Sequence, residues 1–179
     1  QGGLSIYGAL LGFLATSIVF LRKYGYNLWL WFDLMMPSIL FGLIILQLAN
    51  FMMQFSLGTP LGLDIPNDHS LAEYVEYRYR PTGFEAYQYF QPVALYQAFA
   101  YSIVFIISVL CLLINRKYKF LAEGTVFLFS VILMAIIRFG IGFMYFSVNK
   151  DMLLYPMQWI ALTVMIATVF IYVVKRFST

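Results

Sequence analysis

Five apolar stretches, separated by short polar segments, dominate the pattern of hydrophobic and polar positions along the chain. A helix needs about 20 apolar residues to cross the hydrocarbon core of a bilayer. Each stretch is close to this length or longer, which predicts five transmembrane helices. They cover residues 4–21, 28–55, 93–114, 125–146 and 152–174. The pattern therefore predicts an all-α fold, a polytopic helical bundle in an integral membrane protein.

The second predicted helix and the segment that follows it differ from the rest of the chain. The helix is long and contains Pro37, so we expect a kink or a break there. Residues 57–90 are rich in Pro, Gly, Tyr and charge, and they form the one sizeable segment expected outside the membrane. No repeat divides the chain, so residues 1–179 are expected to form a single membrane domain. Because the sequence begins at Gln1 rather than at a methionine, we expect a processed or incompletely represented product.

Basic residues cluster after the first, third and fifth predicted helices. Arginine and lysine near helix ends are typical of the cytoplasmic side of a membrane. Alternating spans bring all three clusters to one side. The clusters are Arg22 and Lys23, then Arg116, Lys117 and Lys119, then Lys175 and Arg176. We therefore expect a cytoplasmic C-terminus and an extracytoplasmic loop at residues 57–90.

The composition excludes several classes of function. The chain is 63% hydrophobic and 11% charged, whereas a soluble domain has about 25% charged residues. The basic residues behind the net charge of +3 are clustered at the ends of the predicted helices, a pattern typical of membrane topology. Nucleic acid is therefore not an expected partner. The single cysteine, Cys111, forms neither an internal disulfide nor a metal cluster. The single histidine, His69, is expected in the loop, either satisfied by hydrogen bonds or exposed to solvent, rather than acting as a catalytic base. No metal or cofactor is expected.

Three amides stand in the apolar run at residues 41–58, where lipid-facing helices seldom carry them. Gln47, Asn50 and Gln54 are spaced by three and four residues, so they share one face of a helix. A buried amide without a partner costs about 1–3 kcal/mol. This face is therefore expected to contact a protein interior, a wet cavity or a polar ligand.

Arg138 is a charged residue inside the fourth predicted helix. At the bilayer centre an arginine costs at least about 2.5–3.5 kcal/mol. It either extends to the outer headgroups or faces the bundle and binds an anion such as a lipid phosphate. The nearby Gly140 and Gly142 favour the second interpretation because they allow close backbone approach. Asp33, near the cytoplasmic end of the second helix, is interpreted as an interfacial acid close to Arg22 or the basic loops.

Other polar residues are also expected in the outer half of the membrane. Each amide alone could hold helices together, but together with Asn50, Gln54 and Arg138 they favour a shared polar cavity. These further residues are Gln91, Tyr96, Gln97 and Gln158.

The order of these motifs resembles the prolipoprotein diacylglyceryl transferase family, bacterial membrane enzymes that move diacylglyceryl from phosphatidylglycerol to a lipobox cysteine. GGLSIYGALLG is similar to the family's GG-[LM]-S-[IF]-H-G-G-L-I-G, and FGLIILQLANFMMQFSLGTP to its signature G-x-x-x-G-R-x-G-N-F-[IM]-N-x-E-x-x-G-x-P. QPVALYQA is similar to H-P-[ST]-Q-L-Y-E, IIRFGIGFMY to R-F-x-x-E-F-x-R, and PMQW to the final M-G-Q segment. The match runs from about Gly2 to the C-terminus and leaves out the family's first helices.

The departures from the family pattern fall on its polar positions. Neutral residues replace its histidines, its signature arginine, three acids and a second arginine, at Tyr7, Gln47, Phe55, Gln91, Gln97, Gly142 and Tyr145. The positions that align with family motif residues are Tyr7, Gln47, Asn50, Gly58, Gln91, Tyr96, Arg138 and Gln158. The resemblance implies that a lipid phosphate would be bound by Arg138, Asn50 and Gln47.

The lost charges bear directly on the expected chemistry. Thioether formation needs a base to make the cysteine thiolate and cations to neutralise the leaving glycerol phosphate. Glutamine lacks the charge of arginine, and a tyrosine of pKa about 10 is a poor base at neutral pH. Losing one such group commonly costs about 10²–10³ in rate. The substitutions therefore favour a protein that is not an enzyme.

Three hypotheses follow for a protein of the bacterial plasma membrane. The first is a catalytically degenerate relative of the transferase that binds lipid or serves as a structural subunit of a membrane assembly. Its expected partners are a phosphatidylglycerol-like phospholipid and other membrane or lipoprotein subunits. The second is an active, diverged transferase in which Arg138 holds the phosphate. The third is an assembly subunit whose polar face packs only against partner helices.

Overall fold

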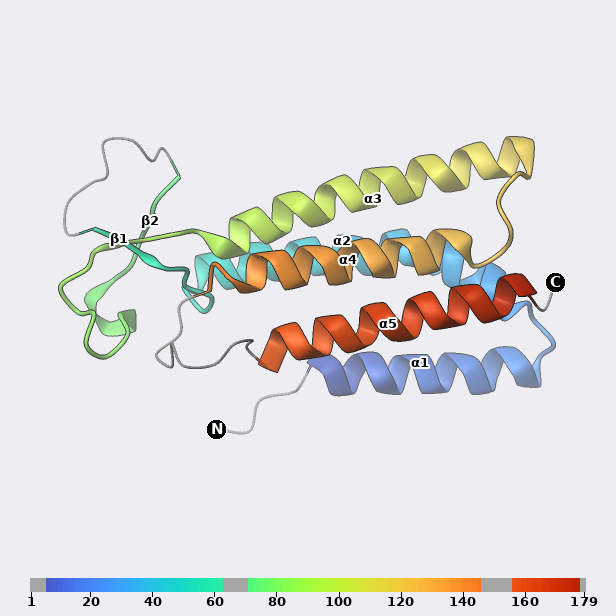
Figure 1. Ribbon diagram of the computed structural model, residues 1–179, viewed down its shortest axis with the longest axis horizontal. Helices are drawn as coiled ribbons and strands as arrows, with labels where there is room; N and C mark the ends of the chain where they lie inside the picture. The colour runs from blue at the N-terminus through green and yellow to red at the C-terminus, as the bar shows by residue number, and fades with distance from the viewer. Residues whose placement is uncertain (1–5, 63–70, 146–155, 178–179) are drawn as a thin grey trace.

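The computed structural model describes residues 6–62, 71–145 and 156–177, which form a bundle of long helices with a small sheet at one end (Figure 1). The helices are α1 (Ile6–Lys23), α2 (Leu28–Met52), α3 (Val93–Tyr118), α4 (Thr125–Gly142) and α5 (Pro156–Phe177). Of these, α2, α3, α4 and α5 are long and apolar enough to cross a membrane. The predicted all-α membrane bundle is confirmed, and a membrane span through α1 stays a prediction.

The C-terminal ends of α2, α3, α4 and α5 differ from the predicted ends by three or four residues, with α5 ending at Phe177 rather than at residue 174. The second helix ends at Met52 rather than at residue 55, and α4 ends at Gly142. α3 continues to Tyr118, past the predicted end at residue 114. Residues 4 and 5 and residues 152–155 lie outside the described parts of the chain.

Of the kink or break expected at Pro37, the break is wrong, because α2 is one uninterrupted helix, and the kink stays a prediction. Proline has no N–H to donate to the carbonyl four residues earlier, which here is that of Asp33. Packing on α3 and α4 holds the helix together across this missing bond, since Met36 and Leu40, on either side of Pro37, are fully buried with Val104 of α3. The Phe32 and Phe127 rings stack with their centres 5.0 Å apart.

The predicted extramembrane loop contains a small antiparallel sheet. Its strands are β1 (Pro60–Gly62), β2 (Glu73–Tyr74) and β3 (Tyr89–Phe90), in the order β1-β3-β2, and η1 (Tyr77–Tyr79) is a single turn of 3₁₀ helix. Phe90 in the central strand pairs with Pro60 on one side and Glu73 on the other. Because Phe90 is buried and α3 begins three residues later, the sheet fixes where α3 starts.

At the opposite end of the bundle, Asp33 caps the N-terminus of α4. Its carboxylate accepts hydrogen bonds from the backbone N–H groups of Gly124, at 2.6 Å, and Phe127, at 2.7 Å. The first N–H groups of a helix lack partners within the helix and carry a partial positive charge, so a carboxylate is a favourable cap. Asp33 therefore contacts the segment that follows the basic residues 116–119, one of the two positions expected for it, and its place at a membrane interface stays a prediction. It is a buried residue that ties α2 to α4.

Candidate functional site

Gln47 and Asn50 form a hydrogen-bonded pair on α2. The Asn50 Nδ2 donates to Gln47 Oε1 at 3.2 Å. Gln47 is buried and Asn50 is half-buried. The pair satisfies part of the hydrogen bonding that these amides need inside the bundle.

Gln54 does not share the helical face of this pair, which corrects the prediction of three amides in a row. It follows the end of α2 and has left-handed backbone geometry, with a φ of 54°. Its side chain instead forms hydrogen bonds with the backbone of the loop. The Nε2 donates to the Tyr74 carbonyl at 2.8 Å, and the Oε1 accepts from the Glu76 N–H at 3.2 Å.

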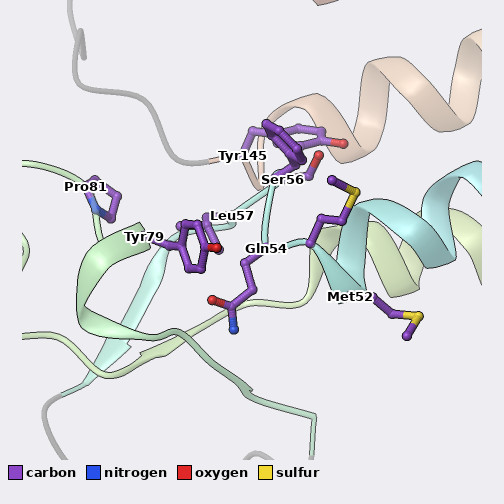
Figure 2. A pocket seen from close by; sticks show the side chains of 9 residues that line it. Met52, Gln54, Ser56, Leu57, Tyr79, Pro81 and Tyr145 are labelled. Carbon is purple, nitrogen blue, oxygen red and sulfur yellow. The ribbon is translucent and has the colours of Figure 1, made fainter.

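A cavity of about 730 Å³ lies where α2, the loop and the end of α4 meet (Figure 2). It is lined by Met52, Met53, Gln54, Phe55, Ser56, Leu57, Tyr79, Pro81 and Tyr145. These side chains carry no charge, so they offer apolar surface with amide and hydroxyl groups. Of the polar residues predicted to share one cavity, Gln54 alone lines this one. The cavity therefore lies beside the predicted polar site rather than at its centre.

Arg138 of α4 is half-buried and contacts α3 and α5. Its Nη2 lies 3.9 Å from the sulfur of Met157, and its charge lies close to the hydroxyl of Tyr101. Tyr101 is buried on α3. This geometry favours the interpretation in which Arg138 faces the bundle over the one in which it extends to the headgroups.

Gln97 links Tyr101 to the end of α4. Its Nε2 donates to the Tyr101 hydroxyl at 3.3 Å, and its Oε1 accepts from the Tyr145 hydroxyl at 2.9 Å. Gln97 has no exposed surface. Spacing along the sequence could have shown that Gln97 and Tyr101 are neighbours, because they are four residues apart on one helix. No local pattern shows the contact with Tyr145, which is 48 residues away.

Gly58 lies at the junction of three elements. Its N–H donates to the Gln91 carbonyl at 3.1 Å, just before α3, and it forms a bridge with Tyr145, just after α4. A Cβ at this position would come within 2.5 Å of Val93 Cγ2 and 2.6 Å of the Gln91 carbonyl oxygen. Glycine is therefore the residue that this junction accommodates.

The remaining predicted positions are Gln158, Tyr96 and Tyr7. Gln158 of α5 is fully buried against Gly142, and its Nε2 donates to the Phe139 carbonyl at 3.4 Å. Tyr96 is half-buried on α3. The side chain of Tyr7 lies outside the described residues. A common phosphate site of Arg138, Asn50 and Gln47 stays a prediction.

The described residues contain no group of three His, Cys, Asp or Glu side chains that could hold a metal ion. What they do bring together, at the ends of α3 and α4 nearest the sheet, is an arginine, two tyrosine hydroxyls and a buried amide, beside an uncharged cavity. Such a set can bind an anionic headgroup next to an apolar chain.

A sequence profile of the prolipoprotein diacylglyceryl transferases matches residues 1–174. The chain belongs to this family. Among its curated relatives is a phosphatidylglycerol–prolipoprotein diacylglyceryl transferase of Shouchella clausii, 30% identical over 98% of this chain and 61% of the relative. A protein of the same name from Geobacillus kaustophilus is 29% identical over 98% of this chain and 62% of that relative. One from Bacillus licheniformis is 33% identical over 74% of this chain and 46% of the relative.

The chain thus spans about six tenths of the length of the first two relatives. No solved structure matches it. Membership in the transferase family and the apolar helices make it a multi-pass protein of a bacterial membrane.

Proposed function

We propose that this protein acts as a diverged transferase that moves diacylglyceryl from phosphatidylglycerol to the cysteine of a prolipoprotein. The substitutions alone favour a non-catalytic relative. The match over residues 1–174 and the names of the relatives support the catalytic role instead. The observation that carries the proposal is the position of Arg138, a retained and half-buried cation that lies close to Tyr101 of α3 and Met157 of α5.

The reaction sets clear demands on the site. The sulfur of the cysteine thiolate attacks the glycerol carbon that bears the phosphoester oxygen. A C–S bond forms, the C–O bond breaks, and its electron pair leaves on glycerol phosphate, while the thiol proton passes to a base. A cation beside the phosphate stabilises the charge that develops on the leaving group. In this proposal Arg138 supplies that cation, with Gln47 and Asn50 orienting the headgroup.

Substitution of Arg138 tests this role. Arg138→Ala is expected to lower the rate of thioether formation by about 10²–10³, because one charge that stabilises the transition state is removed. Arg138→Lys keeps the charge but loses the two-pronged contact, so its rate should lie between those of Ala and Arg. The measurement is transfer from phosphatidylglycerol to a lipobox peptide by the purified protein. Arg176→Ala, at the far end of the bundle, is the control and should leave the rate unchanged; equal rates for Arg138→Ala and the parent would contradict the proposal.

A second function is lipid binding without turnover, alone or as a subunit of a membrane assembly. It is favoured by Gln47, Gln97 and Tyr145, neutral residues with neutral hydrogen-bond partners at positions where the family pattern carries arginines and an acid. Native mass spectrometry after gentle extraction separates these roles. Phospholipid bound without transfer supports the second function, and fixed stoichiometry with other proteins without lipid supports an assembly subunit.

A further inference from the structure

The side chain of Gln54 occupies the outer edge of β2, which is an edge strand in the order β1-β3-β2. Just after β2, the Val75 N–H donates to the Gln88 carbonyl at 3.0 Å, on the side of β3. The Tyr74 carbonyl and the Glu76 N–H therefore face outward, because alternate residues of a strand bond to opposite sides. The Gln54 amide pairs with both groups, at 2.8 and 3.2 Å. It bonds to this edge as the backbone of a neighbouring strand would, since it has one oxygen acceptor and N–H donors.

The backbone of Gln54 is strained at a position where glycine would fit. Its φ of 54° lies in the left-handed region, which glycine often adopts just after a helix. A residue with a side chain is strained there. The two hydrogen bonds of the side chain give a physical reason for a glutamine at this position. The family pattern leaves the position unspecified, so this contact is a property of the present chain.

The cavity next to this edge fits an uncharged ligand. Gln54 lines it together with Tyr79 and Pro81, which follow β2 in the loop (Figure 2). The described side chains that line it carry no charge. Two of them, Phe55 and Tyr145, stand where the family pattern carries a glutamate and an arginine. An ion would lose its hydration here without meeting an opposite charge, whereas apolar groups and a polar backbone are both accommodated.

Other bonds hold β2 in place independently of Gln54. Phe90 of β3 pairs with Glu73. The Arg80 side chain donates to the Val75 carbonyl at 3.0 Å and to the Glu85 carbonyl at 2.8 Å. The outer edge of β2 therefore keeps its shape when the Gln54 amide moves away.

We propose that the outer edge of β2 binds an extended, uncharged segment of the prolipoprotein as an added strand. The segment displaces the Gln54 amide from the Tyr74 carbonyl and the Glu76 N–H, and its apolar side chains enter the cavity. This inference rests on the proposed function, because it assigns the surface to the peptide that receives the lipid. Edge strands are templates for pairing with another chain, and strand addition is a common mode of peptide recognition. Exchange of one amide for another leaves the number of hydrogen bonds unchanged, so the affinity comes from apolar surface buried in the cavity.

The first test measures binding of an uncharged lipobox peptide to the full chain in detergent, without lipid. The peptide has about ten residues, the upper length of a typical strand, and each of its backbone amides is methylated in turn. Methylation removes one N–H and leaves the side chains unchanged. Because successive amides of a strand face opposite sides, methylation of an amide that faces β2 is expected to weaken binding about tenfold or more. Methylation of the amides on either side of it is expected to leave binding unchanged.

A second test removes the competing amide. Gln54→Ala is expected to bind the unmethylated peptide about tenfold more tightly than the parent chain does. Gln88→Ala, the same change at an exposed side chain of the same loop, is the control and should bind as the parent does. Amide hydrogen exchange shows whether the loop stays folded, because protection of the Val75 N–H reports its bond to Gln88. The Glu76 N–H loses its acceptor in Gln54→Ala, and the peptide is expected to slow its exchange.

The methylation series uses the parent chain, so it decides the question even where the loop of Gln54→Ala unfolds. Methylated peptides that all bind equally would overturn strand addition. So would a folded Gln54→Ala that binds the peptide no more tightly than Gln88→Ala. A peptide that does not bind would also overturn it, and binding of dihexanoyl glycerol instead would assign the cavity to a neutral lipid.

The outcomes separate this inference from the proposed reaction. If binding depends on alternate amides while the parent chain transfers no diacylglyceryl, strand addition stands and the transferase proposal fails. If the peptide is modified while all its methylated forms bind equally, the transferase proposal stands and strand addition fails.

Discussion

At the scale of single residues, Gly58 shows how a lone contact constrains the site. The loop after α2, the start of α3 and the end of α4 meet there, and the space that a side chain needs is already filled by Val93 and Gln91. The same junction holds Tyr145, which lines the cavity. A substitution at Gly58 is therefore expected to disturb both the packing of the junction and the candidate site.

Gly58→Ala is expected to lower the free energy of unfolding by about 1–3 kcal/mol, because the added methyl group overpacks the junction. Thermal unfolding in detergent measures the loss. Gly140→Ala is a matched control, because a Cβ there meets nothing within 4 Å, and its melting temperature should equal or slightly exceed that of the parent. Equal melting temperatures for Gly58→Ala and Gly140→Ala would show that the junction is not tightly packed.

Glu73 is a buried acid in the loop, and its Oε2 has no hydrogen-bond partner. Burial raises the pKa of its carboxyl group from 4.5 to about 7. Between these two values the folded loop keeps a proton that the unfolded chain has released. The free energy of unfolding therefore decreases as the pH rises through this window, and it levels off above about pH 7.

Glu73→Gln is expected to remove this decrease and to stabilise the loop above pH 7 by up to roughly 3 kcal/mol. Amide hydrogen exchange of residues 73–76, measured from pH 5 to 8 and corrected for the intrinsic rate, reports the change. Glu85→Gln serves as the control, because hydrogen bonding from the Gly83 backbone lowers the pKa of the Glu85 carboxyl, so its titration falls below the window. A parent protein whose corrected protection stays constant across this range would contradict the account of Glu73.

At the scale of elements, Asp33 decides how α4 begins. Gly124, with a φ of 81°, precedes the helix and offers no side chain to cap it. The Asp33 carboxylate from α2 does so instead. The cap thus ties two helices of the core together near the end of the bundle away from the sheet.

Asp33→Ala is expected to lower the free energy of unfolding by about 1–3 kcal/mol, because two N–H groups at the start of α4 lose their acceptor. Asp33→Asn keeps an acceptor oxygen and should lose less. Denaturant titration in micelles measures both variants. An Asp33→Asn variant as unstable as Asp33→Ala would assign the effect to the lost charge rather than to the cap.

The helices could be predicted from the sequence because spans of apolar residues are local and long. The start of α3 beside Gln91-Pro92 follows from the same kind of evidence, since proline suits a first turn. The cap at Asp33 depends on residues 91 positions apart, and the Gln97–Tyr145 bond on residues 48 apart. No periodicity encodes such contacts, so they could not be read from the sequence alone.

For Gln54 the local spacing pattern predicts a position that the structure does not have. Its spacing from Asn50 places it on the same helical face only if α2 continues to that point. The helix ends at Met52, and Gln54 turns to the loop. A prediction that depends on the last turn of a helix is the most sensitive to where that helix ends.

At the scale of the whole molecule, the charge pattern predicts an orientation in the membrane. The C-terminal ends of α1, α3 and α5, which carry the basic clusters, lie at one end of the bundle, and the sheet lies at the other (Figure 1). We propose that the basic end is cytoplasmic and that the loop at residues 57–90 is extracytoplasmic.

Cysteine labelling of intact cells tests this orientation. In a Cys111→Ser background, Tyr77→Cys, in the exposed turn η1, is expected to react with a membrane-impermeant maleimide. Lys119→Cys, at the end of α3, is expected to react only after the cells are opened. Labelling in the reverse order would place the loop in the cytoplasm and contradict the proposed orientation.

The measurement that most directly tests the proposed activity is the mass of a lipobox peptide after incubation with the purified chain and phosphatidylglycerol. The account predicts a peptide that gains one diacylglyceryl group on its cysteine, with one glycerol phosphate released for each peptide modified. A peptide of unchanged mass, from a chain that still binds phosphatidylglycerol, would contradict the transferase role and leave a lipid-binding member of the family.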